Sequence, residues 1–86
     1  MEPNAIGLRG VLTKEGSRDT RLELRHDPFG YAVVIDGKEV GRYYRTYSAQ
    51  QLMTGNCPPM TLGEAWLSYT AKHFPSYVAT NMEEHR

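Results

Sequence analysis

The fold of this chain is decided by the stretch Tyr31-Ala-Val-Val-Ile-Asp-Gly-Lys-Glu-Val-Gly-Arg-Tyr-Tyr-Arg-Thr-Tyr47. Its first arm, residues 31–35, is nearly all apolar and rich in β-branched and aromatic side chains, which favours a central β-strand. Asp36-Gly37 is a favoured pair for a type I′ turn, because both turn positions need a positive φ. The stretch therefore predicts a β-hairpin whose return strand runs over 40–47.

Side-chain alternation along the two strands predicts which hairpin residues share a face. With a two-residue loop, one face carries Tyr31, Val33, Ile35, Val40, Arg42 and Tyr44. The other face carries Ala32, Val34, Gly41, Tyr43, Arg45 and Tyr47. The first face holds more bulk and is expected to form the core, whereas a three-residue loop would reverse the assignment.

Two further strands are expected before the hairpin. Residues 6–13 predict a first strand, and the polar, glycine-containing segment 14–19 predicts a hairpin loop. Residues 20–25 alternate cleanly between apolar and charged side chains, which indicates a half-buried strand. A turn is expected over 26–30, because Pro28 fixes its own φ.

Two capping boxes predict the helices. The Ser48-x-x-Gln51 pattern starts a short helix, which the stiff loop around Pro58 stops. The Thr61-x-x-Glu64 pattern starts the main helix, expected over 62–73. Its apolar stripe comprises Leu62, Ala65, Trp66 and Tyr69.

The expected fold is a single α+β domain over residues 1–86. It comprises a small antiparallel sheet of three or four strands, with the hairpin at 31–47 and a C-terminal α-helix at about 62–73 packed on one face. A final short strand over 76–80 is a further candidate, followed by a polar tail over 81–86.

Composition limits the partners and the compartment. The net charge is zero, from ten basic and ten acidic side chains, whereas duplex-DNA binders usually carry excess positive charge. Cys57 is the only cysteine, which points to a reducing compartment and most simply the cytoplasm. No signal-peptide pattern or membrane-spanning run is expected, so the chain is predicted to be soluble.

The sequence contains no recognisable catalytic arrangement. His26, His73 and His85 are far apart and lack a metal-type partner at helical spacing. Cys57 precedes two prolines and has none of the surroundings typical of a catalytic cysteine. The expectation is therefore a non-enzymatic protein without cofactor or metal.

The predicted binding surface is the outer face of the hairpin, joined by the neighbouring strand. Its candidate residues are Tyr43, Arg45, Tyr47, Arg21 and Arg25. Tyrosine and arginine dominate protein interfaces, which favours a protein partner or a second copy of the chain. Stacking on single-stranded RNA or DNA is the alternative, placed second by the neutral charge. A solvated outer face with no partner accounts for the same residues.

Residues Asp36-Gly-Lys-Glu-Val-Gly41, followed by Ser48-Ala-Gln-Gln-Leu52, resemble the hairpin-then-helix of some small phage anti-CRISPR proteins. The resemblance covers less than a quarter of the chain. It implies a small regulatory protein of a phage or mobile element that inhibits by binding.

Overall fold

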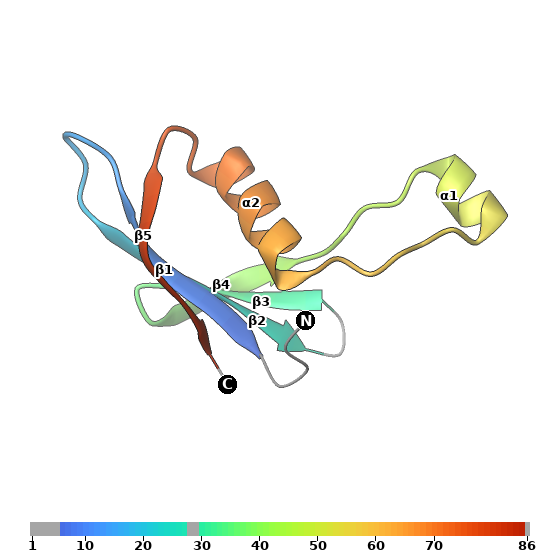
Figure 1. The fold of residues 1–86 in the computed structure, drawn as a ribbon, viewed down its shortest axis with the longest axis horizontal. Helices are drawn as coiled ribbons and strands as arrows, with labels where there is room; N and C mark the ends of the chain where they lie inside the picture. The colour runs from blue at the N-terminus through green and yellow to red at the C-terminus, as the bar shows by residue number, and fades with distance from the viewer. Residues whose placement is uncertain (1–5, 28–29, 86) are drawn as a thin grey trace.

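The computed structural model describes residues 6–27 and 30–85 as an open antiparallel sheet with one helix lying across it (Figure 1). The strand order is β4-β3-β2-β1-β5. The strands are β1 (Gly7–Thr13), β2 (Thr20–Asp27), β3 (Gly30–Ile35), β4 (Lys38–Tyr43) and β5 (Val78–His85). The helices are α1 (Ala49–Thr54) and α2 (Leu62–His73). The α+β class is confirmed, whereas the expected three or four strands are five.

The fifth strand overlaps the final strand predicted over 76–80 and replaces the described part of the predicted polar tail. β5 pairs with β1 along its whole length, so α2 is followed by a strand and is not the C-terminal element. All residues of β5 except the last are exposed. The strand therefore lacks the alternation of apolar and polar residues by which a half-buried strand is recognised in a sequence. Asn81, at φ 53°, lies where the register between β1 and β5 shifts.

The core lies between α2 and the face of the sheet beneath it. The sheet contributes Leu12, Leu22, Leu24, Tyr31 and Val33, all almost fully buried. From α2, the predicted apolar stripe contributes Ala65, Trp66 and Tyr69. This packing confirms that Leu22 and Leu24 face inward and that the capping box at Thr61 starts the main helix.

A β-bulge in β4 overturns the predicted faces of the hairpin. The two-residue turn is as predicted, since Ile35 pairs with Lys38. Val33, however, stands opposite Gly41 and not Val40, because β4 contains one extra residue at this point. Every later residue of β4 therefore points to the face opposite to the one predicted.

Because of the bulge, two side chains lie on the faces opposite to those predicted for them. Tyr43 stands opposite Tyr31 and packs beside α2 on the covered face. Arg42 stands opposite Ala32, on the side of the sheet that α2 leaves uncovered, and pairs with Asp27. We call that uncovered side the open face.

The return strand is also shorter than predicted. β4 ends at Tyr43, and the chain then leaves the sheet until α2 begins at Leu62. Residues 44–61, which include α1, form a projection that we call the arm (Figure 1). The turn predicted around Pro28, the first five residues and Arg86 lie outside the described residues.

Candidate functional site

The arm is the part of the molecule that stands apart from the core. Figure 1 shows α1 at the end of the arm, well away from the sheet and from α2. None of the six residues of α1 is buried. Leu52 and Met53, which are adjacent in the chain, are 64% and 86% exposed, so the tip presents two large apolar side chains to solvent.

Local hydrogen bonds give the arm a defined shape. Ser48 and Gln51 form the predicted capping box at the start of α1, and Gly55 ends the helix at φ 72°. The hydroxyl of Tyr47 donates to the carbonyl of Pro58, which joins the outgoing and returning limbs. The tip therefore has regular structure although it buries nothing in this chain.

Beyond Arg45 at its base, the arm also differs from the rest of the chain in charge. None of residues 46–63 is acidic, basic or histidine. Charged residues make up 23% of the chain, so a stretch of this length would hold about four. The absence of charged residues over 46–63 can be read from the sequence. It indicates the arm as a candidate binding segment, whereas the predicted binding surface was the hairpin.

The base of the arm is fixed to α2 and to β3. Arg45 lies 3.3 Å from the carboxylate of Glu64, and Tyr31 donates its hydroxyl hydrogen to the carbonyl of Met60. Hydrogen bonds from the backbone and hydroxyl of Thr61, and then the charge of Arg45, hold the pKa of Glu64 below its ordinary value. Burial, reinforced by the charge of Glu64, raises the pKa of Tyr31.

The five predicted binding residues do not form one surface. Tyr43 packs edge-on against Tyr69, with ring centroids 5.5 Å apart, and its hydroxyl bonds to that of Ser68. Arg45 and Tyr47 lie together in the arm, with the guanidinium 5.6 Å from the ring centroid. Only Arg21 and Arg25 lie on the open face, in β2.

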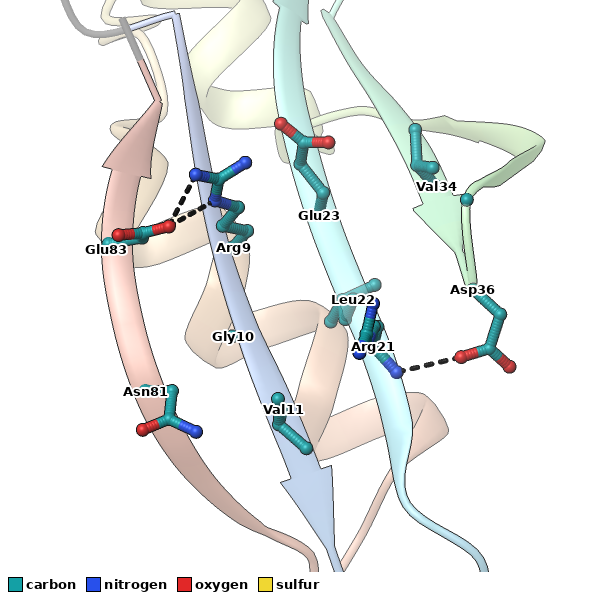
Figure 2. Close-up of a pocket in the computed structure, with 11 residues that line it drawn as sticks. Arg9, Gly10, Val11, Arg21, Leu22, Glu23, Val34, Asp36, Asn81 and Glu83 are labelled. Atoms are coloured by element: carbon teal, nitrogen blue, oxygen red, sulfur yellow. Dashed lines mark hydrogen bonds and ion pairs between the residues drawn. The ribbon is translucent and has the colours of Figure 1, made fainter.

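The open face is a shallow hollow with an apolar floor and a charged margin. Figure 2 shows Val11 and Val34 in this hollow, with Arg9 and Glu83 on one side and Asp36 on the other. The hollow measures about 690 Å³. The Arg9 guanidinium lies 2.5 Å from the Glu83 carboxylate, so much of the charge is neutralised within the chain.

Glu23 is the most enclosed charged group of this hollow. Its side chain is 15% exposed, and its carboxylate lies 3.3 Å from Arg25 and 3.5 Å from His85. Arg21 has no ion-pair partner among residues 6–27 and 30–85, although its backbone N–H donates to Asp36. The hollow thus offers one unpaired guanidinium beside several ion-paired charges, and the buried Oε2 of Glu23 accepts no hydrogen bond from the described residues.

Metal-ligating side chains are not clustered in the part of the chain that the structure describes. Groups of three or more His, Cys, Asp or Glu that could hold a metal are lacking among these residues. Cys57 is exposed, and its thiol donates to the carbonyl of Gln51. Neither described helix is long and apolar enough to cross a membrane.

Comparison with known proteins finds no matching family model, curated relative or solved structure. The function is therefore inferred from the geometry of this chain.

Proposed function

We propose that this chain is a non-enzymatic protein-binding module that inserts its arm into an apolar groove of another protein. The observation that carries the proposal is the exposed pair Leu52 and Met53 on a helix with no buried residue. A phage or mobile-element inhibitor, the function implied by the resemblance at 36–52, would be one form of such a module.

Energetics support a partner for the arm. A helix of one or two turns is marginal in water and gains stability mainly by packing an apolar face against another surface. α1 has no such surface in its own chain, because none of its residues is buried. Covering Leu52 and Met53 would remove large apolar areas from water, which is the main favourable term in association.

Composition indicates a protein partner for the arm. Interface centres are depleted of charged residues and enriched in methionine and tyrosine. Residues 46–63 have no charged side chain and contain Tyr47, Met53 and Met60. A nucleic-acid contact would need basic groups to neutralise phosphates, and this segment has none.

Site-specific photo-crosslinking can test this proposal. A photo-crosslinking amino acid placed at Met53 in the native host should form a covalent adduct with one protein. The matched control carries the same group at Leu67 on α2, which is 70% exposed, and should give no such adduct.

The protein captured in the adduct can then be purified, and its Kd for this chain provides the quantitative test. Replacing Leu52 and Met53 by Asp should raise the Kd at least tenfold, since charge would enter the apolar centre of the contact. Leu67→Asp should leave the Kd unchanged. Equal crosslinking from both positions, or parental affinity in the L52D/M53D variant, would overturn the proposal.

Single-stranded nucleic acid is the second candidate, on the open face. Alternation and register bring Arg9, Arg21, Arg25 and Arg42 to that face. All except Arg21 are paired with carboxylates, which weakens their attraction for phosphate. Fluorescence anisotropy with labelled RNA and DNA oligomers at low salt tests this candidate, and an unchanged signal excludes it.

A further inference from the structure

The outer edge of β4 is one of the two ends of the sheet. All of its residues except the last are exposed, and Val40 at its centre is 54% exposed. An edge strand presents unpaired N–H and C=O groups to which another strand can add. The residues of β4 that direct these groups outward determine what can pair there.

The hydrogen bonding of β3 identifies those residues. The N–H of Asp36 donates to the carbonyl of Arg21, so this backbone position faces β2. Backbone direction alternates along a strand, and Val34 and Ala32 therefore also face β2. Their opposite residues on β4, Glu39 and Arg42, must direct their own N–H and C=O groups to the free edge.

The bulge gives these two positions regular spacing and a common face. Glu39 and Arg42 are three residues apart, but they stand opposite Val34 and Ala32, which are two residues apart on β3. Both side chains therefore lie on the open face. Without the extra residue, they would lie on opposite faces of the sheet.

An acidic and a basic residue at such positions make the edge self-complementary. If a second copy pairs antiparallel through a two-fold axis between Val40 and Gly41, each Glu39 stands opposite Arg42 of the other copy. Opposite charges directly across an antiparallel pair attract, whereas like charges repel. The two-fold produces this favourable pairing twice, as an isologous interface requires.

The Glu39 and Arg42 side chains are both able to form this ion pair with a second copy. Glu39 has no ion-pair partner within the described part of the chain, and Arg42 uses its guanidinium on Asp27. A guanidinium has five N–H donors, so it can serve both Asp27 and a second carboxylate. A Cβ added at Gly41 would meet nothing within 4 Å, so no side chain crowds the strand at this point.

We propose that a second copy of this chain pairs with the β4 edge, in antiparallel register with Glu39 opposite Arg42. The two sheets then form one continuous sheet with both α2 helices on the same face. Backbone hydrogen bonds at Glu39 and Arg42, and an ion pair at each end, join the copies. The arm is not part of this contact and remains available to a different partner.

Charge exchange at the two positions tests the register. Glu39→Arg places two arginines opposite each other at both ends, and Arg42→Glu places two glutamates there. Each single variant should raise the dimer Kd by roughly ten- to thirty-fold in sedimentation velocity. The 1:1 mixture of the two variants should form a heterodimer, because each basic side chain at the interface then meets an acidic one.

Controls separate this interface from self-association through the arm. L52D/M53D should dimerise like the parent, and loss of its dimer would assign self-association to the arm. Amide exchange at Glu39 and Arg42 should slow with rising protein concentration, while exchange along β5 stays constant. This readout needs no substitution and therefore holds even if Arg42→Glu does not fold.

Three further results would overturn the proposal. They are a parent that stays monomeric at millimolar concentration, single variants that dimerise like the parent, and concentration-dependent protection at β5 in place of β4.

Discussion

At the scale of single residues, Tyr43 shows how one inserted residue changes a role. The sequence places it on an exposed face, but the bulge turns it under α2 against Tyr69. Its ring and its bond to Ser68 therefore belong to the packing of α2 on the sheet.

We expect Tyr43→Ala to lower the free energy of unfolding by about 2 kcal/mol, since an aromatic ring leaves a partly buried site. Urea denaturation gives this value. Arg21→Ala, an exposed change on the open face, should stay within about 0.5 kcal/mol of the parent. A Tyr43→Ala variant as stable as the parent would mean that the ring does not pack under α2.

Gly10 occupies a position where a side chain does not fit. A Cβ added there would lie 2.5 Å from the Met82 sulfur and 3.3 Å from the Trp66 ring. We expect Gly10→Val to destabilise the protein by about 2 kcal/mol, because β5 or Met82 must shift outward.

Gly41→Ala is the matched control, since its added methyl group meets no atom within 4 Å. It should change stability by less than about 0.5 kcal/mol. A Gly10→Val variant that unfolds at the same urea concentration as the parent would contradict the close approach of Met82 and Trp66 to Gly10.

At the scale of elements, the helix caps, the hairpin turn and the buried side of α2 were predicted correctly, because each depends on a few residues close together in the sequence. The capping boxes, the Asp36-Gly37 turn and the apolar stripe of α2 are all present as expected. Only residues 78–80 of β5 lie within the predicted final strand. The rest of β5 was missed because an exposed edge strand gains its stability from backbone pairing with β1, which leaves no apolar pattern. The bulge was missed because the glycine at it, Gly41, is compatible with a regular strand as well as with a bulge, so the exposed surface was assigned to the wrong residues.

The capping box of α2 also predicts a pH dependence. The pKa of Glu64 lies below its ordinary value, chiefly because Thr61 donates hydrogen bonds to its carboxylate. A lowered pKa stabilises the folded state above the unfolded pKa, and this contribution is lost as the pH falls through the folded pKa. Glu64→Gln should therefore show a smaller decrease in Tm between about pH 5 and about pH 3.

Arg45→Gln is the control, because it removes the ion pair and keeps the bonds from Thr61. It should retain most of the parental slope of Tm against pH. A Glu64→Gln slope equal to that of the parent would show that other carboxylates account for the acid limb.

At the scale of the whole molecule, the chain has two parts with different roles. One part is the sheet with α2, and the other is the arm. The first supplies the buried core, whereas α1 buries nothing and adds length to the molecule, whose extents are 45 × 27 × 22 Å. If binding and folding are separated in this way, the tip of the arm can be removed without loss of the fold.

Replacing residues 48–57 by a short Gly-Ser linker tests this separation. Tyr47 and Pro58 are joined by a hydrogen bond, so the linker closes a gap that is already short. We expect the free energy of unfolding to change by less than about 1 kcal/mol, since the residues removed contribute nothing to the core. Affinity for the arm's partner should be lost, and self-association through β4 should persist, because Glu39 and Arg42 are untouched. A large fall in Tm would instead make the arm part of the folding unit, and its exposed apolar tip would then serve folding as well as binding.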